Sequence, residues 1–357
     1  MQRSAARLGT AIHRHAGHLT LTQAVQRQPQ RLVAELVSAH QETHHVKQFD
    51  FIVRDVLPDP DRSPLWLDRP PRGPRGRTSA PLAAPPASPA VAGVASSTAD
   101  GDEGHGVERL TPFQPGQWCD FFVRGIETVA GFSLVSAPHA LPRFQLALQE
   151  SAYSAIVQHL WHRARPHERF QLRFGGGFVL QSDRRTPLLL IAGGVGLNPL
   201  MSMLRTLAAR GHDAPVQLLY SVADAADVLF LDALDTCLRQ LPSAHATLFL
   251  TQDLPADPGS RAAAAAAEWP AALTPAARLA RWRAIPRTRV ETGRIGPEHL
   301  AARLAALQAR PRAPDGATPV HGVHVYMCGP TSMENALIRD LQHMQIDPDA
   351  IFYEEWW

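Results

Sequence analysis

The chain has 357 residues, which is long enough for two ordinary domains with length left for extensions. Its formal net charge of +2 gives no sign of a protein that binds nucleic acid or of a basic membrane-binding patch. Cys119, Cys237 and Cys328 lie far apart without a C-x-x-C pair, so neither a metal site nor a disulfide framework is predicted. No uninterrupted apolar run is long enough to span a bilayer, and the sequence predicts a soluble protein.

The N-terminal segment is rich in arginine and contains no acidic residue before Glu35. Arg3, Arg7 and Arg14 fall near helical spacing. This composition is typical of a mitochondrial transit peptide. We therefore predict that residues 1–40 direct the protein to the mitochondrial matrix, although a basic helix or a disordered tail would have a similar composition.

Short strand-like segments follow, first at 46–57 and then in QWCDFFV, GFSLVSAP, FQLALQES and RFQLRFGGGFVL. A helix is predicted for SAYSAIVQHLWHRAR. Short strands separated by turn residues are typical of an antiparallel barrel, which we predict over 46–182. Residues 58–106 are rich in Pro, Ala, Gly and Ser and bury little apolar surface, so they predict a disordered insertion or an extended polyproline spacer.

After Pro187 the predicted strands and helices alternate. The strands are TPLLLIAG, APVQLLYSV, HATLFLTQ, GVHVYMCGP and IFYEEWW, and the helices are NPLMSMLRTLAARG, AADVLFLDALDTCLRQL, PEHLAARLAALQAR and SMENALIRDLQHM. This alternation is typical of a doubly wound parallel sheet, which we predict over 187–357. Residues 254–288 contain a run of six alanines and predict a surface insertion that could be helical in part.

The first candidate site follows the first strand of this second domain. Gly193, Gly194 and Gly196 allow a sharp turn and a close approach of a ligand to the backbone. Pro199 stands at the start of a predicted helix, where its missing N–H costs little. Free N–H groups and the positive end of the helix dipole favour a phosphate there. The pattern indicates a dinucleotide site, but it also fits a strand-to-helix turn without a ligand.

A second candidate site, Cys328-Gly329-Pro330, ends a later strand. Ligands in open α/β sheets bind at this edge. Cys328 could form a small wall beside a flat ring or act as a nucleophile, and a buried small residue is the alternative.

Tyr220 and Ser221 end the second strand, where adenosine ribose is usually recognised. No arginine that could bind a 2′-phosphate follows them, and Asp224 and Asp227 would repel such a phosphate. This favours NADH over NADPH. The alternative is that both aspartates only cap the next helix.

These pieces resemble the ferredoxin–NADP reductase superfamily over 46–57 and 107–357. The shared pattern runs P-G-Q-W, aromatic-Ser-x-x-Ser, a Gly-rich strand end, G-G-x-G-x-N-P, Y-S-V, T-G-R-I, C-G-P and a terminal aromatic. The resemblance implies a ferredoxin-reductase-like fold, with an FAD-type antiparallel barrel followed by a doubly wound NAD-binding domain. It also implies an FAD-dependent oxidoreductase that passes hydride from NADH to FAD and on to an unidentified acceptor.

The resemblance assigns roles to individual residues. Phe132 would replace the tyrosine that stacks on the flavin, and the catalytic pair would be Ser133, near flavin N5, and Cys328, near the nicotinamide ring. Trp356 or Trp357 would cover the flavin. The remaining cofactor-binding residues would be Ser136 in the same barrel motif, Gly175, Gly176 and Gly177 beside the FAD phosphates, Gly193, Gly194, Val195, Gly196, Leu197, Asn198 and Pro199 around the nicotinamide nucleotide's pyrophosphate, and Tyr220, Ser221, Gly329 and Pro330.

One departure from the family keeps a second hypothesis open. The family's arginine that pairs with the FAD pyrophosphate corresponds to Ala130. The chain could therefore be a non-catalytic NAD-binding sensing or scaffold module that has lost FAD. A plain NAD dehydrogenase ranks last, because it needs an acid–base such as Tyr-x-x-x-Lys, which is absent. No iron–sulfur or haem motif is recognisable, so the predicted electron acceptor is a separate protein or a small molecule.

Overall fold

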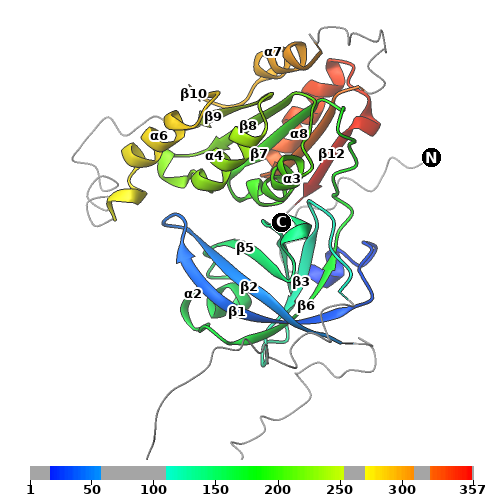
Figure 1. Cartoon of the computed structure of the whole chain (residues 1–357), viewed down its shortest axis with the longest axis vertical. Helices are drawn as coiled ribbons and strands as arrows, with labels where there is room; N and C mark the ends of the chain where they lie inside the picture. The colour runs from blue at the N-terminus through cyan, green and yellow to red at the C-terminus, as the bar shows by residue number, and fades with distance from the viewer. Residues whose placement is uncertain (1–16, 58–109, 253–269, 309–321, 356–357) are drawn as a thin grey trace, which may run out of the picture.

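The computed structural model describes residues 17–57, 110–252, 270–308 and 322–355. They form an antiparallel barrel and a parallel α/β sheet that lie one above the other along the long axis (Figure 1). The insertion predicted at 58–106 lies outside the described residues, as do 1–16 of the predicted targeting segment, 253–269, Trp356 and Trp357. None of the described helices is long and apolar enough to cross a bilayer.

The barrel is built on one six-stranded sheet in the order β4-β3-β6-β1-β2-β5. Its strands are β1 (Arg31–Gln41), β2 (Val46–Leu57), β3 (Trp118–Phe122), β4 (Ala130–Ser133), β5 (Arg143–Gln149) and β6 (Arg169–Gly175). A bridge between Leu134 and Leu146 brings the two edges together. Aromatic rings fill the interior, with the Phe51 and Phe144 centroids 5.2 Å apart, and α2 (Ala155–His162) buries Leu160 and Trp161 against it.

The strand β1 lies almost entirely inside the segment 1–40 that the sequence predicts to be a targeting peptide. It pairs with both β2 and β6 in the middle of the sheet, and Leu32 to Leu36 are all buried. Because both faces of this strand are covered, its sequence shows no polar–apolar alternation that would have indicated a strand. A cleavage at residue 40 would remove a central strand of the barrel.

The α/β domain is a parallel sheet in the order β10-β9-β8-β7-β11-β12. Its strands are β7 (Leu188–Gly193), β8 (Val216–Val222), β9 (Ala244–Leu250), β10 (Thr288–Thr292), β11 (His324–Gly329) and β12 (Ile351–Glu355). The helices are α3 (Leu197–Ala209), α4 (Leu231–Gln240), α6 (Pro275–Ala284), α7 (Pro297–Gln308) and α8 (Thr331–His343). Alternate residues of β7 point to opposite cores: α3, α4 and α6 cover one face, and α7 and α8 cover the other.

The segment 254–288 differs from the surface insertion that the sequence predicts. Its described part, from 270 onward, contains α6 and the start of β10, which pairs with β9. Trp282 on α6 is fully buried, and its indole donates to the carbonyl of Arg289. The alanine- and arginine-rich composition concealed one crossover helix, because only three of its residues, Arg278, Leu279 and Trp282, are buried.

Helix α3 joins the two domains. The Asn198 side chain donates to the carbonyl of Ala147 at 2.8 Å, and the Ser202 hydroxyl donates to the carbonyl of Ser136 at 2.7 Å. Asn198 and Ser202 are four residues apart and therefore lie on one face of the helix. This face fixes the beginning of α3, and the glycine turn before it, against the barrel.

Candidate functional site

The two glycine motifs lie side by side at the carboxyl edge of the parallel sheet. β7 and β11 are neighbours, with Ala192 opposite Cys328. From β7 the chain continues to β8 on one side, whereas β11 lies on the other side. The order of strands therefore reverses here, and such a switch point is where open α/β sheets bind ligands.

The turn after β7 depends on two glycines for different reasons. Gly194 has φ +54°, and a Cβ there would meet open space. A Cβ at Gly196 would lie 2.1 Å from the carbonyl oxygen of Cys328, so the two motifs touch through their backbones. Helix α3 begins at Leu197, which makes Pro199 its third residue. A backbone N–H at that position would have no carbonyl partner within the helix, so the proline removes no hydrogen bond.

A cavity of about 450 Å³ opens between this edge and the barrel. We call it the interface cavity. The barrel supplies Phe132 and Ser133 from β4, and the sheet edge supplies Cys328. The full lining is Gly131, Phe132, Ser133, Ala147, Leu148, Gln149, Val157, Gly193, Gly194, Val195, Gly196, Asn198, Cys328, Gly329 and Pro330. Ten residues that the sequence proposes as site residues thus meet in one space, although up to 198 positions separate them along the chain.

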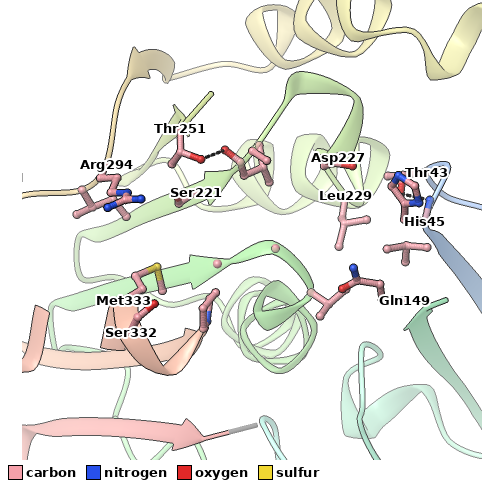
Figure 2. Close-up of a pocket in the computed structure, with 18 of the residues that line it drawn as sticks. Thr43, His45, Gln149, Ser221, Asp227, Leu229, Thr251, Arg294, Ser332 and Met333 are labelled. Atoms are coloured by element: carbon pink, nitrogen blue, oxygen red, sulfur yellow. Dashed lines mark hydrogen bonds between the residues drawn. The ribbon is translucent and has the colours of Figure 1, made fainter. Parts of the chain in front are cut away.

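A second cavity of about 520 Å³ extends along the ends of the parallel strands, and we call it the nucleotide cavity. It shares Gln149, Gly193, Gly194, Val195 and Pro330 with the interface cavity. Figure 2 shows Ser221, Thr251 and Arg294 at one end, and Asp227, Thr43 and His45 at the other. Thr43 and His45 belong to the hairpin between β1 and β2, so the barrel forms part of this wall as well.

Arg294 is the cation of the nucleotide cavity that sequence reasoning did not single out. It is exposed, and within the described ranges no carboxylate lies within ion-pair distance of its guanidinium. The sequence does contain a signal for this residue, because Arg294 is the arginine of the T-G-R-I pattern after β10. An unpaired arginine at a sheet edge can bind a phosphate or a carboxylate.

The two aspartates that follow Ser221 in the sequence have different surroundings. The Asp224 carboxylate accepts from the backbone N–H of Ala226 at 2.7 Å and does not line the cavity. Asp227 does line it, and burial raises the pKa of its carboxyl. Tyr220 lies in the core, where its hydroxyl accepts from the N–H of Leu229 at 3.3 Å. Tyr220 therefore shapes the loop that carries Asp227 instead of facing a ligand.

The turn at Cys328 is held by a buried carboxylate. Glu334, in the first turn of α8, is 1% exposed, and its Oε1 accepts from the N–H of Gly329 at 2.9 Å. The bond keeps the Cys328–Pro330 backbone against Gly193. The helix-start signal in the sequence predicts an acidic residue here, but not its burial.

Comparisons with known proteins agree with this geometry. Residues 190–264 match a family model described as the oxidoreductase NAD-binding domain. A curated relative from Bos taurus, oxidoreductase NAD-binding domain-containing protein 1, is 27% identical over 69% of this chain and 72% of its own length. The FAD/NAD-binding domain of a Vibrio cholerae nitric oxide dioxygenase superposes with TM-score 0.55 at 15% identity, covering 91% of this chain and 98% of that one. The ferredoxin–NADP⁺ reductase of Plasmodium falciparum gives TM-score 0.52 at 12% identity, covering 91% and 96%.

The resemblance to the ferredoxin–NADP reductase superfamily is confirmed. The fold is ferredoxin-reductase-like, as the sequence predicts, with a six-stranded antiparallel barrel followed by a six-stranded parallel sheet. Together these findings support an NAD(P)H oxidoreductase.

Several residues assigned by the resemblance lie away from both cavities. Gly175 and Gly176 pack against Trp118 and the segment around Arg27. The Ser136 hydroxyl accepts from the N–H of Gln145 at 3.1 Å. The positions that line neither the interface cavity nor the nucleotide cavity are Ser136, Gly175, Gly176, Gly177, Leu197, Pro199 and Tyr220, and Trp357 lies outside the described residues.

The interface cavity fits the ring part of a flavin in this ferredoxin-reductase-like fold. It offers an aromatic side chain, Phe132, a hydroxyl, Ser133, and apolar walls that include Val157. Among the described residues that line this cavity there is no arginine or lysine that could pair with an FAD phosphate. Ala130, at the family's arginine position, is half-buried and packs against the barrel core.

Proposed function

We propose that this chain is a flavin-dependent NAD(P)H oxidoreductase that takes hydride from NADH by way of FAD and passes it to an acceptor not yet identified. One observation carries the proposal: barrel residues Phe132 and Ser133 and sheet-edge residues Gly194 and Cys328 line a single cavity. A flavin held by the barrel and a nicotinamide held by the sheet edge would meet there, and proximity of the two reactants is the main contribution a protein makes to such chemistry.

We assign the nucleotide cavity to NADH. The open backbone at Gly194 would approach the diphosphate, with the N-terminus of α3 behind it. Ser221, at the end of β8, would accept the adenosine ribose, and Arg294 would contact the diphosphate. The proposed preference for NADH over NADPH rests on Ser221 at the ribose position, since Asp227 lies at the other end of the cavity (Figure 2) and would not face a 2′-phosphate there.

We assign the interface cavity to the FAD ring. Bound FAD would supply the two-electron chemistry that amino-acid side chains lack. Phe132 would pack on the ring, and the Ser133 hydroxyl would donate a hydrogen bond to it. Cys328, which is buried, would form a small wall where the nicotinamide enters. Leu148 and Val157 would keep water from the reacting centres.

The test is a visible absorption spectrum of the full-length protein after reconstitution with FAD and removal of free FAD. We expect a flavin band that NADH bleaches under argon. A protein that binds NADH by calorimetry but retains no flavin would overturn the flavoenzyme proposal. That outcome would favour the alternative, a non-catalytic NAD-binding sensing or scaffold module, which is motivated by Ala130 and by the absence of a cation from the interface cavity's lining.

We further propose that the protein acts in the mitochondrial matrix. The proposal rests on the arginine-rich, acid-free composition before Glu35. Because β1 begins at Arg31, the targeting test should use residues 1–30 fused to a fluorescent reporter. A reporter that stays in the cytosol would disprove this localisation.

A further inference from the structure

A third cavity, of about 700 Å³, lies between the two domains and shares no lining residue with the nucleotide or interface cavities. We call it the α3–α4 cavity. On the barrel side it is bounded by β2, β5 and the short helix η3 (Pro138–Ala140), and on the other side by α3 and α4. Small residues at Ala208, Ala209 and Ala233 leave this space open between the helices and the barrel.

Arg205, on α3, is one of the charged residues that line the α3–α4 cavity. One guanidinium nitrogen, Nη1, donates to Gln145 Oε1 at 2.5 Å and to the carbonyl of Val135 at 3.3 Å. Within the part of the chain that the structure describes, Nε and Nη2 have no hydrogen-bond acceptor, and no carboxylate lies within ion-pair distance. Burial lowers the pKa of Arg205, and the nearby Asp50 and Glu42 carboxylates act in the opposite direction. Arg205 is half-buried, and its two unused donor nitrogens can bind an anion that enters the cavity.

The barrel side of the cavity supplies a second arginine. Arg143 and His139 stand on the barrel rim, and no described carboxylate pairs with Arg143. The one acidic residue of the lining is Asp50. Its carboxylate already accepts from the Ser38 hydroxyl at 2.8 Å and from the Gln145 side chain at 2.7 Å.

Small apolar residues line the space between these charges, Ala137 and Ala140 on the barrel side and Ala208 and Ala233 on the helices. We propose that the α3–α4 cavity binds an organic anion that has an apolar portion, with its carboxylate, phosphate or sulfonate group on Arg205 and Arg143. Such a ligand would contact both domains and helix α3, whose other end forms the glycine turn of the nucleotide cavity. It would bind without displacing NADH.

The probe for this site is 8-anilinonaphthalene-1-sulfonate, an aromatic sulfonate that fluoresces when bound in an apolar place. We expect one saturable site on the full-length protein, unaffected by saturating NADH. Arg205→Gln should weaken binding by about tenfold, the size expected for loss of a charge-assisted hydrogen bond. Arg143→Gln, at an exposed position, should weaken it by a smaller factor without any risk to folding.

The matched control is Arg239→Gln. It removes the same charge from an exposed position on α4 that does not line the cavity, so binding of the probe should not change. The proposal is overturned if NADH displaces the probe, or if both cavity variants, folded by circular dichroism, bind it as tightly as the wild type. These outcomes do not depend on whether the protein retains FAD.

Discussion

The Glu42 side chain, at the tip of the β1–β2 hairpin, reaches across the domain boundary to Arg278 on α6. Arg278 is 3% exposed, and its Nη2 lies 3.2 Å from Glu42 Oε1, while its Nη1 donates to the Glu42 carbonyl at 2.8 Å. The same Oε1 accepts from the N–H of Phe230 at 2.8 Å, and Phe230 has φ +55°. This contact seats Thr43 and His45 in the wall of the nucleotide cavity.

Glu42→Ala should therefore destabilise the protein by about 3 kcal/mol, because it leaves a buried arginine without its anion. Urea unfolding measures the change. Asp232→Asn is the matched control: it breaks the pair with Arg281 at a side chain 92% exposed, and it should change the unfolding free energy by less than about 1 kcal/mol. Equal effects of the two substitutions would mean that the Glu42–Arg278 contact does not hold the domains together.

The two turn glycines should respond differently to alanine. Gly196→Ala places a Cβ against the backbone of Cys328, which cannot move freely, and should destabilise the protein by roughly 2 kcal/mol or more. The Cβ of Gly194→Ala meets no neighbouring atom, so this substitution should lower the stability by only about 1 kcal/mol, because of the left-handed backbone at this position. Its methyl group enters the nucleotide cavity. We expect Gly194→Ala to remain folded and to bind NADH weakly. Thermal unfolding and calorimetry separate the two effects, and tight NADH binding by Gly194→Ala would contradict the assigned site.

Arg294→Gln tests which phosphate of the nucleotide Arg294 contacts. If Arg294 contacts the diphosphate, which NADH and NADPH share, the substitution should weaken binding of both by about tenfold. Titration of each nucleotide into wild type and variant gives the two ratios. A loss confined to NADPH would place Arg294 at the 2′-phosphate and would overturn the proposed preference for NADH.

The barrel should lose stability in acid through Asp120, which is fully buried. Burial raises the pKa of this carboxyl, but hydrogen bonds from His18, Arg27 and Arg173 outweigh it and lower the pKa to about 2. A folded-state pKa below the ordinary value contributes stability above about pH 4, and this contribution is lost as the pH falls from about 4 to 2. It amounts to about 2 kcal/mol, since one pKa unit corresponds to about 1.4 kcal/mol.

The measurement compares urea unfolding of wild type and Asp120→Asn between pH 6 and pH 3. The two proteins should differ most at pH 6, and the difference should shrink toward pH 3. A difference that stays constant over this range would show that the ionisation of Asp120 does not contribute to stability.

Truncation distinguishes a targeting segment from the folded barrel. Removal of residues 1–16 leaves every described contact in place, including the 2.7 Å pair between Arg27 Nε and Asp120 Oδ2. Removal of residues 1–40 takes away β1 and should prevent folding. Circular dichroism and solubility of the two truncated proteins provide the comparison, and a well-folded protein without residues 1–40 would contradict the position of β1 in the sheet.

The sequence by itself determined the fold class and the local chemistry. Period-two and helical patterns, the glycines after β7 and the C-G-P turn are local signals, because backbone freedom and helix starts depend on neighbouring residues. They predicted the barrel, the alternating α/β sheet and the two motifs at its edge, and ten of the assigned residues line one cavity.

Only the tertiary structure decided which residues share a space. Thr43 and His45 enter the nucleotide cavity because the β1–β2 hairpin brings them there, and no local pattern indicates this. Arg294 belongs to the T-G-R-I pattern, but only the sheet order places it in the cavity. Strand β1 was not predicted, and 254–288 was predicted as a surface insertion that could be helical in part. The burial of β1 and α6 comes from distant partners, such as the contact of Arg278 with Glu42. Contacts between residues far apart in the chain depend on packing, which composition and periodicity do not encode.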